Sequence, residues 1–227
     1  LILIANIYLS FHAQDNKLYL ADPFIIEDKG TFYAYGTSKY SDEGIAVYKS
    51  KDLKHWEGPC GKAEKGLALH KKDAWGENKF WAPEVYKIKG KYIMTYSAEE
   101  HIVIAEANSP AGPFKQKKPF KPYLPKQKSI DSHIFIDDDG TPYIYWVRWG
   151  LGKGNEIHVS TLSDDLKTIN GKSTECLYSM PGTWERCDID TTRKVAEAPF
   201  VLKHKNLYYL SYSCNTFRMG NYSVGYA

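Results

Sequence analysis

The order of apolar and polar positions repeats four times along the chain. Each repeat has an acidic or aromatic residue, an apolar strand, a polar turn and a second strand rich in aromatic residues, and the first two repeats show no helical period. The four hairpins are expected at residues 22–38, 82–98, 131–149 and 197–214, and third strands at 44–50, 101–107, 156–163 and 222–227. Hairpins of one design that recur along a chain are typical of a repeat protein.

The spacing of these units predicts an all-β fold, a β-propeller. Asp22, Glu84, Asp131 and Glu197 are separated by 62, 47 and 66 residues, which suits blades of three to four antiparallel strands. The first strands of all blades then surround one axis, so residues far apart in sequence meet in a funnel at one end of it. The fourth unit stops early, and the chain is therefore expected to be truncated within or after its fourth blade.

The first residues of each unit can be aligned by counting back from the hairpin turns. Trp81, Asp131 and Glu197 each lie nine residues before the turn residue of their unit, whereas Asp22 lies eight residues before Gly30. One position thus holds a Trp and two acids, with a third acid one place on. We expect these four side chains to face the same funnel.

Charge and composition narrow the class of partner. The 30 basic residues exceed the 27 acidic ones by only three, and they are too scattered for a nucleic-acid partner. Four cysteines lack the close spacing of a zinc site, so no metal is assigned. Residues 1–13 are interpreted as a signal-peptide remnant, too short to span a membrane, with an edge strand as the alternative. Residues 14–227 are expected to form a single domain of a secreted or periplasmic monomer.

Two or three carboxylates around one funnel suit the hydrolysis of a glycosidic bond. Inversion needs a general acid on the leaving oxygen and a general base on a water at the opposite face of the sugar ring. Neighbouring carboxylates repel, which raises one pKa and keeps that group protonated near neutral pH. An indole such as Trp81 packs on the apolar C–H face of a sugar. Any one acid could be a solvated turn residue, and the coincidence of three favours catalysis.

Four motifs resemble glycoside hydrolase family 43, a family of inverting five-bladed β-propellers that act on arabinose- and xylose-containing polysaccharides. The motifs are ADPF at 21–24, FWAPE at 80–84, IDSHIFIDDDG at 130–140 and EAPF at 197–200. The resemblance implies that Asp22 is the general base, that Asp131 tunes the pKa and the orientation of its partner, and that Glu197 is the general acid. It also implies a fifth blade, which has no counterpart in the sequence.

The resemblance places further residues around the sugar. Trp81 would border the subsite of the cleaved sugar, with Tyr40 and Trp146 as further walls. Apart from the resemblance, Glu84 lies two residues after Ala82 on the same strand face, where it would hydrogen-bond a sugar hydroxyl or line the inner channel, and His133 is interpreted as a packing or supporting group. No cofactor is required for the chemistry, and a structural calcium at the propeller axis is expected without identifiable ligands.

The function expected from sequence is that of an α-L-arabinofuranosidase or β-xylosidase, with an arabinose- or xylose-containing oligosaccharide or polysaccharide as partner. An endo-arabinanase and a propeller that binds glycans without cleaving them are the alternatives.

Overall fold

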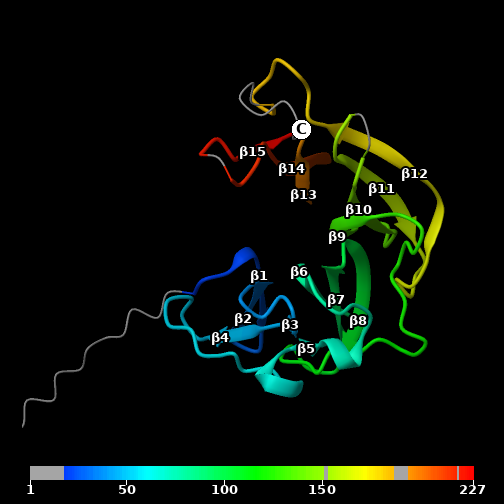
Figure 1. Cartoon of the computed structure of the whole chain (residues 1–227). Coiled ribbons are helices and arrows are strands. Elements are labelled where there is room, and N and C mark those ends of the chain that lie inside the picture. The colour runs from blue at the N-terminus through cyan, green and yellow to red at the C-terminus, as the bar shows by residue number, and fades with distance from the viewer. Residues whose placement is uncertain (1–17, 151–152, 187–193, 219) are drawn as a thin grey trace, which may run out of the picture.

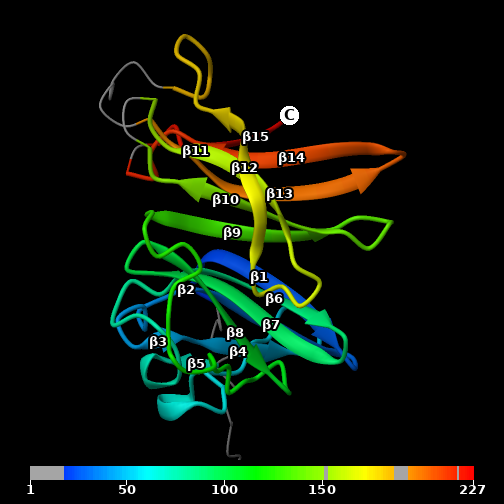
Figure 2. The ribbon, with the colours of Figure 1, turned by 90° about the vertical axis from the view of Figure 1, so that its right-hand side faces the viewer.

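The computed structural model describes residues 18–150, 153–186, 194–218 and 220–227. The predicted leader, residues 1–13, lies outside them. Four of the five sheets in the described residues, here called blades 1 to 4, are arranged around a common centre with one hairpin strand of each innermost (Figure 1). When the molecule is turned by 90°, β9 (Ser129–Ile136), β13 (Ala196–His204) and β14 (Leu207–Cys214) run roughly side by side (Figure 2). The predictions of an all-β chain and of repeated hairpins are confirmed.

Every blade begins with its innermost strand and continues outward in chain order. Blade 1 is β1 (Ala21–Asp28), β2 (Thr31–Thr37) and β4 (Val47–Ser50), and blade 2 is β6 (Trp81–Ile88), β7 (Lys91–Ala98) and β8 (His101–Ala107). Blade 3 is β9 (Ser129–Ile136), β10 (Pro142–Arg148), β11 (Glu156–Leu162) and β12 (Ile169–Tyr178). Blade 4 is β13 (Ala196–His204), β14 (Leu207–Cys214) and β15 (Ser223–Tyr226).

The segment between blades 1 and 2 adds a small sheet and two short 3₁₀ helices. The sheet pairs β3 (Gly44–Ile45) with β5 (Leu69–His70), and the helices are η1 (Glu64–Gly66) and η2 (Lys71–Asp73). The single strand expected at 44–50 is therefore divided between β3 and β4. Within the described part of the chain, no helix has the length and apolarity that crossing a membrane requires.

Three of the four inner hairpins close with the same two-residue turn. Both turn residues have positive φ: Lys29 and Gly30, Lys89 and Gly90, Lys205 and Asn206. A turn of this kind matches the twist of the strands that it joins. The hairpin of blade 3 is longer, because residues 137–141 separate its strands. There the Asp137 amide donates to the Thr141 carbonyl over 3.0 Å.

Apolar side chains fill the three spaces between successive blades. Tyr35, Phe80, Met94 and Tyr96 are fully buried between blades 1 and 2. Ile102, Ile144 and Trp146 lie between blades 2 and 3, and Val147, Ile157 and Cys214 between blades 3 and 4. Burial of one such side chain contributes about 1.5–3 kcal/mol. These cores fix the angle between blades, and so fix the inner strands around the axis.

Candidate active site

All four inner strands carry a β-bulge at the same place. The register between the first two strands of each blade shifts after Ala21, Trp81, Ile130 and Glu197. The residue that follows has a left-handed backbone in every blade: Asp22, Ala82, Asp131 and Ala198, with φ of 50°, 42°, 52° and 53°. Bulges bend a strand and re-aim its side chains. The motifs ADPF, WAPE, IDSH and EAPF thus occupy equivalent positions.

This register corrects the alignment obtained by counting back from the turns. Asp131 shares the left-handed position with Asp22, whereas Trp81 and Glu197 share the position before it. The count failed because the turn of blade 3 is longer than the others, which moved Asp131 one place away from Asp22. Asp22 is therefore in a regular position. The irregular element is the hairpin that follows Asp131.

In blades 2, 3 and 4, the amide of the left-handed residue ties the blade to the one before it. The Ala82 amide donates to Thr37 Oγ1 over 2.9 Å, and the Asp131 amide donates to Ser97 Oγ over 3.1 Å. The equivalent position in blade 3 is Val147, which has no hydroxyl. The Ala198 amide instead donates to Asp131 Oδ2 over 3.2 Å. Asp131 therefore replaces a structural hydroxyl, and this bond holds its carboxylate beside Glu197.

Asp22 is the most exposed of the three acids. The Thr37 hydroxyl donates to Asp22 Oδ2 over 2.7 Å, while the same hydroxyl accepts the Ala82 amide. This chain of two hydrogen bonds fixes one carboxylate oxygen of Asp22 and leaves the other with no hydrogen bond among the described residues. An oriented, solvent-accessible carboxylate is suited to activate a water molecule.

Glu197 lies half-buried at the start of β13. Burial raises the pKa of its carboxyl, and the negative charge of Asp22 raises it further. The Tyr222 hydroxyl, which donates to Glu197 Oε1 over 2.9 Å, opposes this rise because it stabilises the ionised form. The net pKa stays above its ordinary value, which suits a general acid.

The pKa of Asp131 is affected by both of the other acids. Burial raises its pKa well above the ordinary value, and the charges of Glu197, Asp22 and Glu84 add to that rise, against the Ala198 amide that lowers it. Asp131 and Glu197 titrate as an interacting pair. Because their charges repel, the pair retains a proton at pH values where separate carboxyls are ionised.

A second layer of side chains follows two residues further along each inner strand, at Phe24, Glu84, His133 and Phe200. Glu84 accepts a hydrogen bond from the Tyr86 hydroxyl, and its Oε2 lies 2.9 Å from His133 Nδ1. The His133 ring packs on Phe200, with centroids 4.4 Å apart. The structure thus places Glu84 as a lining group of the axis that bonds within the protein, and His133 as a packing group.

The aromatic residues expected around the sugar divide into two groups. Trp81 is partly exposed at the position equivalent to Glu197, with the Lys79 ammonium 5.6 Å from its ring. Tyr40 is partly exposed in the turn that follows β2 and Thr37. Trp146 is only 2% exposed and stacks on His158 between blades 2 and 3. The prediction that Trp146 walls the sugar site is therefore wrong.

Sequence reasoning missed the residues that hold the acids in place. Thr37 ends the second strand of blade 1, where a hydroxyl before a turn gives no distinctive signal. Tyr222 precedes the short third strand of blade 4, 25 residues after the Glu197 that it contacts. The clue in the sequence was that Thr37 and Ser97, both hydroxyl residues, occupy equivalent positions in blades 1 and 2. Recognising this equivalence requires the correct strand register.

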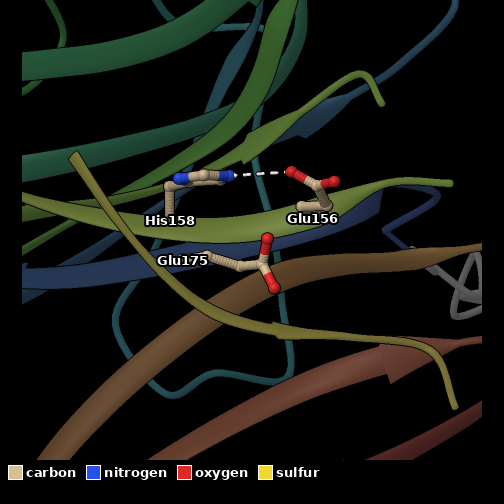
Figure 3. A group of neighbouring side chains, drawn as sticks. All are labelled: Glu156, His158 and Glu175. Carbon is tan, nitrogen blue, oxygen red and sulfur yellow. Dashed lines mark hydrogen bonds and ion pairs between the residues drawn. The ribbon is translucent and has the colours of Figure 1, made fainter. Parts of the chain in front are cut away.

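Three potential metal ligands lie together on the outer strands of blade 3 (Figure 3). Glu156 and His158 are on β11 and Glu175 is on β12. His158 Nε2 lies 3.0 Å from Glu156 Oε2, but Arg148 also pairs with Glu156 and Lys153 pairs with Glu175. Two cations already balance the two carboxylates. These residues lie on the outer strands of blade 3, and the calcium expected at the propeller axis stays a prediction.

The comparison with known families agrees with this geometry. The family model of glycosyl hydrolases family 43 matches residues 17–227, which hold all four bulged strands. The chain belongs to this family. The sequence-based resemblance is confirmed, and so is the assignment of the chain as a hydrolase.

Members of family 43 with known structures share the fold. One is described as an endo-1,4-β-xylanase from Bacteroides thetaiotaomicron; it is 41% identical, with a TM-score of 0.82, and the match covers 94% of this chain and 69% of that one. An endo-arabinase from the same organism is 27% identical, with a TM-score of 0.77, covering 93% and 76%. A curated relative, xylosidase/arabinosidase 43A of Humicola insolens, is 27% identical, covering 87% of this chain and 73% of its own length.

Proposed function

We propose that this family 43 chain hydrolyses α-L-arabinofuranosyl or β-D-xylosyl linkages of plant polysaccharides or oligosaccharides, with inversion at the reacting carbon. The proposal rests on the three acids that the bulges direct to one place. Relatives named xylosidase, arabinosidase and arabinanase support the class of sugar. The names of several relatives include the word extracellular, which supports a secreted or periplasmic location.

The proposed roles follow from the surroundings of each acid. Asp22 is the general base, because it is exposed to water and held by Thr37 at one oxygen only. Glu197 is the general acid, because burial and a neighbouring charge raise its pKa. Asp131 does not transfer a proton to the sugar. Bonded to the Ala198 amide, it orients the strand that carries Glu197, and the charge of Glu197 contributes to the raised pKa of Asp131.

The observation that carries the proposal is the shared position of Asp22 and Asp131 at two bulges, with Glu197 one residue before a third. The β-bulge therefore positions all three carboxyl groups. The charges of Glu197 and Asp22 both raise the pKa of Asp131. Trp81, at the position of Glu197 in blade 2, is proposed to stack on the sugar that is cleaved. Tyr40 is proposed as a further wall.

Stereochemistry tests the mechanism. Proton NMR of the first product formed from an aryl β-xyloside or an aryl α-L-arabinofuranoside should show the anomer opposite to that of the substrate, before mutarotation mixes the two. Retention of configuration would contradict the roles given to Asp22 and Glu197. A chain that binds these sugars but turns over none of them would indicate a binding propeller instead.

An endo-arabinanase is the second candidate, because the names of several relatives specify that activity. The product pattern decides between the two. An exo-acting enzyme releases single sugars from the start of the reaction on linear arabinan, whereas an endo-acting enzyme first releases a range of oligosaccharides and lowers the viscosity early.

A further inference from the structure

A basic cleft lies on the outer side of blades 2 and 3, away from the acids. It encloses about 780 Å³ between β7 and β8 of blade 2, residues 115–125, and the turn that joins β11 to β12. Ile93, which lines it, follows the hairpin turn of blade 2 closely, so the cleft is near the hairpin ends of the blades. The three acids are at the opposite, bulged ends of the inner strands.

Lysines dominate the charge of this cleft. Five lysines and two carboxylates, Glu106 and Asp165, line it. Glu106 pairs with Lys91 over 3.2 Å and with Lys167 over 3.4 Å, and Asp165 accepts the Ser163 hydroxyl. Lys117, Lys118 and Lys121 are exposed and have no carboxylate partner among the residues that the structure describes.

The three unpaired lysines, called here the lysine rim (Lys117, Lys118 and Lys121), sit on a fixed turn. Gln116 Nε2 donates to the Lys121 carbonyl over 2.6 Å, and the Lys121 amide donates back to Gln116 Oε1 over 3.0 Å. This two-way clasp closes the segment that carries all three lysines. A charged turn that is ordered before binding loses less entropy when a ligand arrives.

Aromatic and aliphatic groups form the floor of the cleft. The partly exposed side chains of Ile104 and Tyr123 line it, above the buried side chains of Ile93 and Leu166. The Tyr123 hydroxyl donates to the Leu166 carbonyl over 2.8 Å and its amide donates to the Ile102 carbonyl over 2.7 Å, so the floor is anchored to both blades. An apolar floor below cationic groups offers a surface for the C–H faces of sugar rings together with partners for their carboxylates.

We propose that this cleft binds a polysaccharide bearing uronic-acid units, as a second glycan site that holds the enzyme on acidic regions of its polymer. The lysine rim binds the carboxylates, and the apolar floor packs on the rings. A nucleic acid fits less well. Binding of single strands relies on exposed aromatic rings, whereas Tyr123 is tied through its hydroxyl and the Lys118 ammonium lies 5.4 Å from the Phe120 ring.

The test is affinity electrophoresis and calorimetry of the whole chain at low salt. The probes are polygalacturonate, unsubstituted linear arabinan and a single-stranded DNA. One variant carries Lys117→Gln, Lys118→Gln and Lys121→Gln. A matched control carries Lys29→Gln, Lys54→Gln and Lys205→Gln, which remove three exposed lysines elsewhere. Both variants keep Asp22, Asp131 and Glu197, so failure here is separate from failure of the proposed function.

The wild-type chain should bind polygalacturonate, with affinity that falls as salt is added. The lysine-rim variant should lose about tenfold, since three exposed ion pairs are removed, and the control should lose less than about twofold. Gln116→Ala, which opens the clasp without changing charge, should weaken binding severalfold. Equal losses in the two lysine variants, no binding to polygalacturonate, or equal binding to DNA would each overturn the proposal.

Discussion

Carboxylates lie at both ends of the inner strands, and their pKa values are shifted in opposite directions at the two ends. At the hairpin end, Lys87 of blade 2 pairs with Asp28 of blade 1, and Lys203 of blade 4 pairs with Asp137 of blade 3. Lys87 and Lys203 occupy the same position, two residues before their turns. Hydrogen bonding from Lys87 lowers the pKa of Asp28, and hydrogen bonding from Lys203 lowers the pKa of Asp137 to about 2.

At the bulged end the carboxylates face each other. Among the described residues, no lysine or arginine pairs with Asp22, Asp131 or Glu197, and the pKa values of Asp131 and Glu197 are raised by burial and by the charges of neighbouring carboxylates. The carboxylates at the hairpin end are thus paired with lysines, whereas those at the bulged end have no lysine or arginine partner among the described residues. The cores between blades and the amide bonds at the bulges hold the bulged end together, which is the usual arrangement of a site that must keep a proton near neutral pH.

The largest effect is expected from Glu197→Gln, which removes the proton donor but keeps a group for the Tyr222 hydroxyl. Turnover of substrates with poor leaving groups should fall by about 10²–10⁴, whereas activated aryl substrates should lose far less, because only the former need protonation. Rates on a series of aryl glycosides measure this. Glu27→Ala, an exposed acid near the hairpin end of β1, is the control and should leave both rates unchanged. Equal losses on both substrate types would remove Glu197 from its role.

Asp131→Asn should lower activity and raise stability. Asn tolerates the left-handed backbone and still accepts the Ala198 amide. The pKa of Asp131 is raised in the folded state, so the wild-type protein loses stability as pH rises above the unfolded value of about 3.9. The variant avoids this loss, and its free energy of unfolding should exceed the wild-type value by about 1–2 kcal/mol near pH 7.

Urea unfolding at pH 4 and pH 7 measures this difference, which should be close to zero at the lower pH and grow as pH rises. A variant that is less stable than wild type at pH 7 would show that the charge of Asp131 stabilises the fold.

Lys203→Met at the hairpin end should do the reverse, lowering stability modestly while kcat/KM is unchanged. The pKa of Asp137 is lowered in the folded state to about 2. Its contribution to stability is therefore present above the unfolded value and is lost as pH falls towards 2. The drop in urea midpoint should be seen at pH 6 and shrink at pH 3. A change in kcat/KM would mean that the two ends are coupled.

The smallest effect is expected from Tyr222→Phe. Its hydroxyl lowers the pKa of Glu197, so removing it raises that pKa. Because Glu197 acts protonated, the basic limb of the pH profile of kcat/KM should move to higher pH. Tyr226→Phe, which alters an exposed neighbour on β15, should leave the limb in place. A shift to lower pH would contradict the proposed hydrogen bond.

The repeats, the strands and the three acids could be predicted from the sequence because each hairpin has its own pattern of apolar and polar residues and its own turn residues. The register could not, since it depended on the longer turn after Asp131, and a one-residue error moves a side chain to another position. Trp146 was misplaced because an aromatic residue in a strand suits a core between blades as well as a sugar site. Thr37 and Tyr222 were missed because their contacts join segments that only the assembled fold brings together.

The difference between the two ends of the inner strands is tested most directly by a carbon-13 NMR titration of the labelled Asp and Glu carboxyl groups, assigned with Asp131→Asn, Glu197→Gln and Asp137→Asn. We predict that a proton shared by Asp131 and Glu197 is lost well above the ordinary carboxyl range, while Asp137 titrates near 2. If Asp131 and Glu197 are both ionised by about pH 5, as unperturbed carboxyls are, the bulged end holds no proton for catalysis and the proposed role of Glu197 is contradicted.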